Sequence, residues 1–453
     1  MVGMSVTFGI AGGQLPSSTG GRTRALAPDV ARGTMLLAIA VVNAAWYPWG
    51  HATDSLPDWT PRGADAWGRA LVALTLDSRA YPMFAFLLGY GMVQFHNSRL
   101  RAGRTEREIR AMFNRRHWTM LGFGFLHAGL LFDGDILGPY ALLGLAGVPL
   151  LFHRREVVLR RWLAGLSGLA SLVVIISFLP VGWLSASSGD WSQLPDFHAV
   201  VVDQPGYLVA AAWRLGIWAV FLPVVACVTM IPIAVLAGWI AARHRLLDAP
   251  GEHLRTLRLL ACIGIPVGWG GGLPVALHIV SGAQTSEPAA WETLLHMVTG
   301  APCGIGYVAL FGLFAARQEA RAAQRAGLGG EPRGFLRAMV ALGRRSLSFY
   351  LAQSVVLSPL MCAWGFGLAH RTSAVELVLL CALIWLVSVG LAAALEHRGL
   401  RGPAEVVLRR ITYGIRPPAA GKPPSGVDGA GSEPSVPCTA SQELERRFGR
   451  RPQ

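Results

Sequence analysis

Charged residues are scarce in this sequence. Asp, Glu, Lys and Arg make up 15% of the 453 residues, whereas soluble globular domains carry about 25%. The hydrophobic residues, at 53%, gather in blocks of roughly 20, which is the length of a helix that crosses a bilayer. This composition excludes a soluble globular domain and predicts an all-α fold, a polytopic transmembrane helix bundle.

Lysine, paired cysteines and a cleavable signal are lacking as well. Nearly all basic residues are Arg and lie between the apolar blocks, so the formal net charge of +14 marks membrane topology, and we expect no nucleic-acid partner. The six cysteines form no CxxC pair and no metal-ligand spacing, so we expect no metal site. The first apolar run has no convincing cleavage site, and we expect it to stay as an anchor.

The apolar blocks predict about ten membrane spans. They lie near residues 33–49, 80–96, 117–132, 136–152, 162–184, 218–241, 257–280, 292–315, 346–366 and 374–395. Arginine-rich connections, such as 97–116, alternate with acidic or neutral ones. Because positively charged loops stay on the cytoplasmic side, this alternation predicts that both termini are cytoplasmic.

Three segments carry local predictions. Residues 64–76 have helical apolar spacing and are expected to lie along the membrane surface. Residues 207–217 are expected to form an interfacial lead-in to the sixth span. In the seventh span, three consecutive glycines, 270–272, followed by Pro274 are expected to break or kink the helix.

These features divide the chain into five predicted parts. In order, they are a cytoplasmic amino-terminal arm (1–32), a membrane domain of eight spans (33–315), a basic cytoplasmic linker (316–345), the last two spans (346–414) and a disordered cytoplasmic tail (415–453).

Several polar residues are predicted to gather at the outer face. His127 lies near the outer end of the third span, and Asp133 and Asp135 follow in the turn to the fourth. Asn43 lies within the first span, and His51 follows that span. A carboxylate beside an imidazole fixes its tautomer and stabilises its protonated form, so this group suits a general base. The alternatives are interhelical hydrogen bonds for His127 and Asn43, an ordinary interfacial role for His51, and caps of the fourth span for the two aspartates.

The inner face carries arginines and a polar track. Arg32, Arg115 and Arg116 lie at inner helix ends, where they are suited to bind the phosphates of a cytoplasmic donor. The alternative is that they only determine topology. Tyr140 lies one turn into the fourth span and Gln353 lies inside the ninth, and we predict that both contact substrate, as Asp133 does.

An ordered set of motifs resembles the YeiB-like bacterial inner-membrane family, whose carboxy-terminal half is the domain of unknown function 418. The opening motif has Arg24, Asp29, Arg32, Gly33 and Asn43. The later motifs are 81–84 with 88–91, then Arg115, Arg116, Gly122, His127, 134–137, Tyr140, Ala141 and Gly144, and finally Gly343, Arg344, 346–351, Gln353, Ser354, 402–405 and 409–414. The resemblance covers roughly residues 24–414 and implies a multi-pass protein of the bacterial cytoplasmic membrane.

That family is grouped with the transmembrane acyltransferases, and this relationship implies a function. An acyl group from cytoplasmic acyl-CoA would reach an extracytoplasmic glycan or lipid-linked acceptor. His127 or His51 would be the base, Asp135 would orient the histidine, and Asn43 would bind acyl or acceptor oxygen. Two other interpretations stay open: a transporter or exporter that uses the outer cluster as a relay, and a membrane scaffold that binds lipid and possesses no activity. A homo-oligomer is compatible with each of them.

Overall fold

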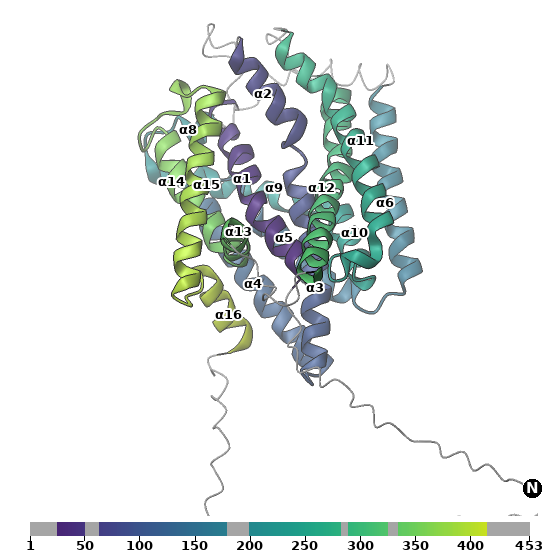
Figure 1. Cartoon of the computed structure of the whole chain (residues 1–453). Coiled ribbons are helices and arrows are strands. Elements are labelled where there is room, and N and C mark those ends of the chain that lie inside the picture. Colours follow the sequence, from purple (N-terminus) through teal and green to yellow (C-terminus); the bar gives the residue numbers. More distant parts are fainter. Residues whose placement is uncertain (1–24, 50–62, 179–198, 282–288, 325–333, 415–453) are drawn as a thin grey trace, which may run out of the picture. The chain divides into compact units, whose positions relative to one another are not determined.

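The computed structural model describes residues 25–49, 63–178, 199–281, 289–324 and 334–414, and these belong to one compact unit, Met1–Gly414. The described residues form helices and no β-strand, which confirms the all-α prediction (Figure 1). The predicted tail, 415–453, and most of the predicted amino-terminal arm lie outside the described residues.

The described residues form the following helices in chain order. They are α1 Leu26–Trp49, α2 Ala64–Thr75, α3 Ala80–Arg101, α4 Glu106–Leu130, α5 Leu137–Leu151, α6 Glu156–Ser177, α8 Ala199–Val202, α9 Tyr207–Val228, α10 Ile231–Arg243, α11 Leu254–Val280, α12 Ala290–Gln324, α13 Gly334–Arg344, α14 Ser346–Met361, α15 Ala374–His397 and α16 Pro403–Tyr413.

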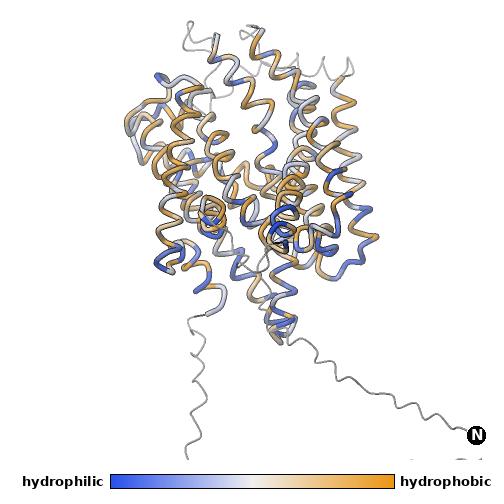
Figure 2. The backbone as a smooth tube through the Cα atoms, viewed as in Figure 1, coloured by the Kyte–Doolittle hydropathy of each residue, from blue (hydrophilic) through white to orange (hydrophobic). Residues whose placement is uncertain are grey.

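Several of these helices are long and apolar enough to cross a bilayer. Among the described residues, seven candidate spans have the required length and hydropathy, and α5, α10 and α14 are shorter apolar helices. Figure 2 shows hydrophobic residues along most of the helices, with hydrophilic stretches at the lower ends in this view. The chain is therefore a polytopic helical membrane protein, while the count of about ten spans and the side of each terminus stay predictions.

The sixth predicted span was placed wrongly. The structure has no interfacial lead-in followed by one span at 218–241, because α9 is a continuous helix of 22 residues and the chain bends at Thr229 and Met230 before α10 begins. Pro232 lies in the first turn of α10, where a proline needs no helical partner for its missing N–H. The bend allows α9 to pack against α4 and α5 while α10 packs against α3 and α6.

The break predicted in the seventh span does not occur. Helix α11 continues over 27 residues and includes both Pro266 and Pro274. Its glycines serve close packing instead: a Cβ on Gly268 would lie 2.1 Å from Cβ of Cys303, and one on Gly271 would lie 2.1 Å from Oγ1 of Thr299. Packing against α12 therefore outweighs the low helix propensity of glycine.

Two predicted connections are largely helical. The segment 97–116 contains the end of α3 and the start of α4, so only 102–105 connect them. The basic linker 316–345 contains the end of α12 and all of α13, with 325–333 outside the described residues. The helix predicted at 64–76 forms as α2 and packs its buried alanines and Val72 against α11 and α15, while its place along the membrane surface stays a prediction.

Glycines hold α1 against α13 at the end of the bundle that carries Arg32. A Cβ on Gly343 would lie 1.8 Å from the carbonyl oxygen of Asp29, and one on Gly33 would lie 2.5 Å from that of Met339. The Asp29 carboxylate also lies 3.7 Å from Nη1 of Arg32 and 3.5 Å from Nε of Arg344. The opening motif and the motif before α14 therefore pack against each other.

Helix α14 is fixed at its first turn by a carboxylate from α16. Oε1 of Glu405 accepts hydrogen bonds from the backbone N–H groups of Leu347 (2.9 Å) and Ser348 (3.1 Å), and the hydroxyl of Ser348 donates to Oε2. An anion at a helix amino terminus is stabilised by unpaired N–H groups and by the helix dipole. This contact sets the position of α14, which contributes to the site below.

Candidate functional site

Three side chains form a hydrogen-bonded series between α4 and α14. Nδ1 of His127 lies 2.8 Å from Oδ1 of Asp135, and Nε2 of the same imidazole lies 2.8 Å from Oγ of Ser354. The side chains of His127 and Asp135 are fully buried. The aspartate and the serine therefore meet opposite nitrogens of one histidine.

The turn after α4 places Asp135 beside His127. Helix α4 ends at Leu130, and α5 begins at Leu137. Oδ2 of Asp135 accepts from the backbone N–H of Gly138 (2.7 Å) and from Nε1 of Trp218 (3.3 Å). The carboxylate thus caps the first turn of α5 with one oxygen and orients His127 with the other, so the capping and orienting interpretations both apply.

A cluster of side chains from α14 surrounds the imidazole. The ring of Tyr350 lies 5.0 Å from that of His127, and its hydroxyl accepts from the N–H of Ile136 at 3.5 Å. Nε2 of Gln353 donates to the carbonyl of Leu36 at 3.1 Å, and its Oε1 is buried without a hydrogen-bond partner. Gln353 therefore lies next to Ser354 and ties α14 to α1, with one acceptor left open.

The network assigns the protons. A carboxylate only accepts, so Nδ1 of His127 carries the hydrogen that it donates to Asp135, and Nε2 accepts from the Ser354 hydroxyl. This is the arrangement in which a serine hydroxyl is activated by an imidazole and the carboxylate stabilises the imidazolium that forms. Burial strengthens these electrostatic interactions because water does not screen them.

The remaining part of the predicted outer cluster is only partly assembled. Asp133 is half-buried in the turn between α4 and α5 and lies within electrostatic range of His127, and burial raises the pKa of its carboxyl group. Asn43 is half-buried on α1 and makes no hydrogen bond to the described residues, whereas Tyr47, one turn further, bonds Oγ of Ser358 at 2.6 Å. His51 lies outside the described residues.

Tyr140, which we predicted to contact substrate, forms a hydrogen bond within the helix bundle. It is buried on α5, and its hydroxyl donates to the carbonyl oxygen of Tyr81 at 2.6 Å. This bond joins α5 to α3, so Tyr140 holds the scaffold beside the site, and its contact with substrate stays a prediction.

The three predicted phosphate-binding arginines differ in exposure. Arg115 is exposed on α4, whereas Arg116 and Arg32 are half-buried. Arg32 forms the ion pair with Asp29 described above, so part of its charge is already balanced. The structure leaves Arg115 most accessible to an anionic ligand.

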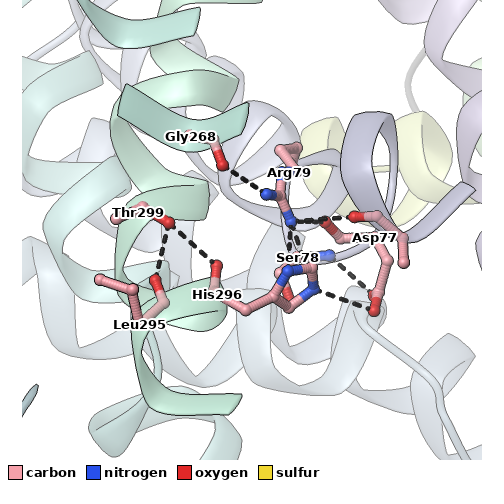
Figure 3. A network of polar contacts seen from close by, with 8 residues as sticks. Asp77, Ser78, Arg79, Gly268, Leu295, His296 and Thr299 are labelled. Atoms are coloured by element: carbon pink, nitrogen blue, oxygen red, sulfur yellow. Dashed lines mark hydrogen bonds and ion pairs between the residues drawn. The ribbon is translucent and has the colours of Figure 1, made fainter. Parts of the chain in front are cut away.

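A second buried polar network lies where α2 and α3 meet (Figure 3). Nη1 of Arg79 donates to the carbonyls of Ala73 (3.2 Å) and Asp77 (2.6 Å) and to Nδ1 of His296 (2.8 Å), while Nη2 donates to the carbonyl of Gly268 (2.6 Å). Nε2 of His296 lies 3.2 Å from Oδ2 of Asp77. Because Arg79 only donates, Nδ1 of His296 accepts, and Nε2 donates to Asp77.

Glycines and a strained residue make room for this network. A Cβ on Gly272 would lie 2.1 Å from Nη2 of Arg79, and one on Gly300 would lie 1.9 Å from the carbonyl oxygen of Ser78. Ser78 itself has φ 56°, a conformation that side chains other than glycine seldom adopt. Gly268 lies near the middle of α11, so the buried Arg79 contacts that helix halfway along its length.

Sequence reasoning missed three contributors to these networks. Ser354 was noted as part of a motif but was not assigned to His127. Trp218 and His296 carried no assigned role, although a histidine within an apolar span is a signal, because polar groups in hydrocarbon are costly. The indole of Trp218 carries no comparable signal, because tryptophan is common in membrane helices.

Comparisons with known proteins agree with the motifs. Residues 241–415 match the family described as "Protein of unknown function (DUF418)"; the match includes Ser354 but neither His127 nor Asp135. The chain is 26% identical over 411 residues to the uncharacterized protein YxaH of Bacillus subtilis (strain 168), covering 85% of this chain and 93% of the relative. It is 25% identical over 417 residues to the uncharacterized protein YeiB of Escherichia coli (strain K12), covering 87% and 97%.

No solved structure matches the chain. The two bacterial relatives extend over both halves of the membrane region, and the family match covers the half that contains α14. Residues 241–415 thus match the DUF418 family, and most of the chain is similar to YxaH and YeiB.

Proposed function

We propose that the protein is an integral membrane acyltransferase, which moves an acyl group from cytoplasmic acyl-CoA to an extracytoplasmic glycan or lipid-linked acceptor. The observation that supports this best is the series Asp135–His127–Ser354, with 2.8 Å at each contact of the imidazole. Nucleophilic and general-base catalysis of acyl transfer both use this order of groups.

The proposed reaction begins at Ser354. Its oxygen attacks the thioester carbonyl, its proton passes to Nε2 of His127, and the bond to sulfur breaks as CoA leaves with that proton. The acceptor hydroxyl or amine then attacks the serine ester, and its proton returns through His127 to Ser354. Asp135 stabilises the imidazolium in both steps. If no acyl-serine forms, the acceptor attacks the thioester directly, and His127 acts as the base.

The other predicted residues keep their proposed roles. Arg32, Arg115 and Arg116 would hold CoA phosphates on the cytoplasmic side of the bacterial inner membrane, with Arg115 as the most accessible of them. Asn43, Asp133, Tyr140 and Gln353 would contact acyl group or acceptor, and His51 is the alternative base.

Purified protein in lipid bilayers, given radiolabelled acetyl-CoA and a longer-chain acyl-CoA, tests the proposal. We expect CoA release in the wild type and a loss of at least about 100-fold in His127→Ala and Asp135→Asn. His244→Ala is the matched control, because its imidazole also bonds a carboxylate, Glu156, at 2.8 Å but is exposed. Absence of CoA binding and release with both donors contradicts the proposal, and loss in His51→Ala alone moves the base to that residue.

The break between α2 and α3 favours a second candidate function, a transporter or exporter. Residues Ala64–Arg101 form one apolar segment of 38 residues that is interrupted beside the middle of α11. Interrupted helices at membrane depth line ion or substrate sites in many transporters. Solute flux into proteoliposomes without CoA, lost in Arg79→Gln and kept in His127→Ala, would support this candidate over the transferase.

A further inference from the structure

Arg214 on α9 is a fully buried cation at the end of α4. Its Nε and Nη2 donate to the carbonyl of Gly129 at 3.2 Å and 3.0 Å, and Nη2 also reaches that of Leu130 at 3.4 Å. These carbonyls belong to the last turn of α4, where the helix dipole places partial negative charge. Arg214 therefore caps the same turn that carries His127.

In the part of the chain that the structure describes, no carboxylate pairs with Arg214. Its guanidinium forms no ion pair with Asp or Glu among the described residues, and its surroundings are the aromatic rings of Tyr207 and Trp364, whose centroids lie 5.4 Å and 5.8 Å from Cζ. Helix-end carbonyls and ring faces compensate only part of a buried charge, whose desolvation costs several kcal/mol. A buried cation in this state attracts an anion.

Two buried N–H donors at this position lack strong acceptors. Among the described residues, Nη1 of Arg214 has no hydrogen-bond partner, and Nε1 of the neighbouring Trp364 has no acceptor stronger than the thiol of Cys362. An unpaired buried donor is energetically unfavourable, and here one comes from α9 and the other from the segment that follows α14. Cζ of Arg214 lies 5.8 Å from the ring centroid of Trp364, so an oxyanion that accepted from both groups would pair the two donors.

The nearest acidic residue is a weak substitute for such an anion. Asp133 lies within electrostatic range of Arg214 but forms no ion pair with it, and burial raises the pKa of its carboxyl group. Among the described residues, Arg214 therefore has no carboxylate in direct contact.

We propose that Arg214 and Trp364 form an oxyanion-binding site that receives a carboxylate or phosphate group of the acceptor. Guanidinium and indole N–H groups bind the anion, while the contacts of Arg214 with Gly129 and Leu130 couple its position to the last turn of α4. The site thus defines the acceptor as an acidic molecule held near His127. Only this assignment to the acceptor rests on the proposed function, because anion binding exists with or without acyl transfer.

Anion binding to the full-length protein in nanodiscs tests the site independently of turnover. Thermal unfolding is followed while phosphate or acetate replaces chloride at constant ionic strength, in zwitterionic nanodiscs and in nanodiscs containing phosphatidylglycerol. We expect saturable stabilisation of the wild type, with an apparent Kd that rises on the order of tenfold or more in Arg214→Gln and Trp364→Phe. Arg214→Lys keeps the charge but loses the planar set of N–H donors, so it is expected to bind more weakly than the wild type and more tightly than Arg214→Gln.

Arg243→Gln is the matched control, because Arg243 also donates to backbone carbonyls near a helix end, those of Arg154 and Leu151, but forms an exposed cap elsewhere in the bundle. Stabilisation by soluble anions identifies a free or glycan-borne group. Stabilisation only with phosphatidylglycerol identifies a lipid phosphate. Either stabilising effect must disappear in Arg214→Gln and Trp364→Phe. Equal anion responses in wild type, Arg214→Gln and Trp364→Phe, or no response in the wild type, overturn the site. If anions bind but no CoA is released, the proposed transferase fails and the oxyanion site stands.

Discussion

Oγ of Ser354 lies 2.8 Å from Nε2 of His127, although the two residues are 227 positions apart in the chain. The contact joins the first half of the membrane region to the half that matches the DUF418 family. The contact is compatible with two chemical roles for the serine. A hydroxyl that donates to an imidazole is either a nucleophile or a group that orients the ring.

Replacing Ser354 separates these two roles. In Ser354→Ala we expect acyl transfer to fall by about 10²–10⁴-fold, together with loss of any acyl label on the protein found by mass spectrometry. Ser358→Ala removes a hydroxyl one turn away that bonds Tyr47 instead, and we expect it to keep the label. A wild-type protein that turns over without a label, and a loss below tenfold in Ser354→Ala, would make the serine an orienting group.

Neutralising Glu405 is expected to loosen the start of α14. Its carboxylate accepts from two backbone N–H groups and from the Ser348 hydroxyl, and hydrogen bonds to charged groups contribute about 1.5–3 kcal/mol each. Glu405→Gln keeps the shape and should reduce the free energy of unfolding by about 1–2 kcal/mol, measured by detergent-induced unfolding.

The control for this change is Glu252→Gln, because Glu252 is exposed and makes no contact of this kind. Acyl transfer should also fall in Glu405→Gln, since Ser354 depends on the placement of α14. Equal unfolding curves for the two variants would show that the contact does not stabilise the fold.

Part of the site was predictable because its members are close in sequence. His127 and Asp135 are separated by one helix end and a short turn, and both are polar residues beside apolar blocks. Their contact was predictable because of this spacing and because polar side chains in hydrocarbon have a high free-energy cost unless they are paired. Ser354 was not placed, because hydropathy indicates which segments are helices and not which helices pack together. Sequence alone therefore located two of the three groups.

The fold was likewise predictable only in part. The helices agree with the apolar blocks, but the break expected at the glycines of α11 did not form, because tight packing against Thr299 and Cys303 compensates for their low propensity. The bend before α10 was missed, although Pro232 in its first turn was a usable signal. Helix propensity predicts the structure poorly where tertiary contacts are strong. Here the backbone at these glycines lies so close to a neighbouring helix that only glycine fits.

Gly343→Ala is expected to be strongly destabilising. Its Cβ would lie 1.8 Å from the backbone carbonyl oxygen of Asp29, so α1 and α13 must separate, and we expect a loss of about 3 kcal/mol in the free energy of unfolding. Gly165→Ala on α6 is the matched control, since nothing lies within 4 Å of its Cβ, and alanine there should add about 1 kcal/mol of stability. Similar midpoints in detergent unfolding for both variants would contradict the close approach.

The amino terminus of α4 should become less stable in acid. Glu108 forms a capping box with Thr105, whose backbone N–H lies 2.9 Å from its Oε2. Hydrogen bonds from the backbone and hydroxyl of Thr105 lower the pKa of Glu108 below its ordinary value of 4.5. A lowered folded-state pKa means that the stabilisation is complete above the ordinary pKa and disappears as the pH falls through the lowered value.

Hydrogen exchange of the first amides of α4 measures this effect. In the wild type, we expect protection to decrease as the pH is lowered below about 4.5, after correction for the intrinsic exchange rate. Glu108→Gln should show the reduced protection already at neutral pH and little further change in acid. Glu106→Gln alters a neighbouring carboxylate that contacts His96 and takes no part in the box, so it should keep the acid response. An acid response that persists in Glu108→Gln would assign it to another group.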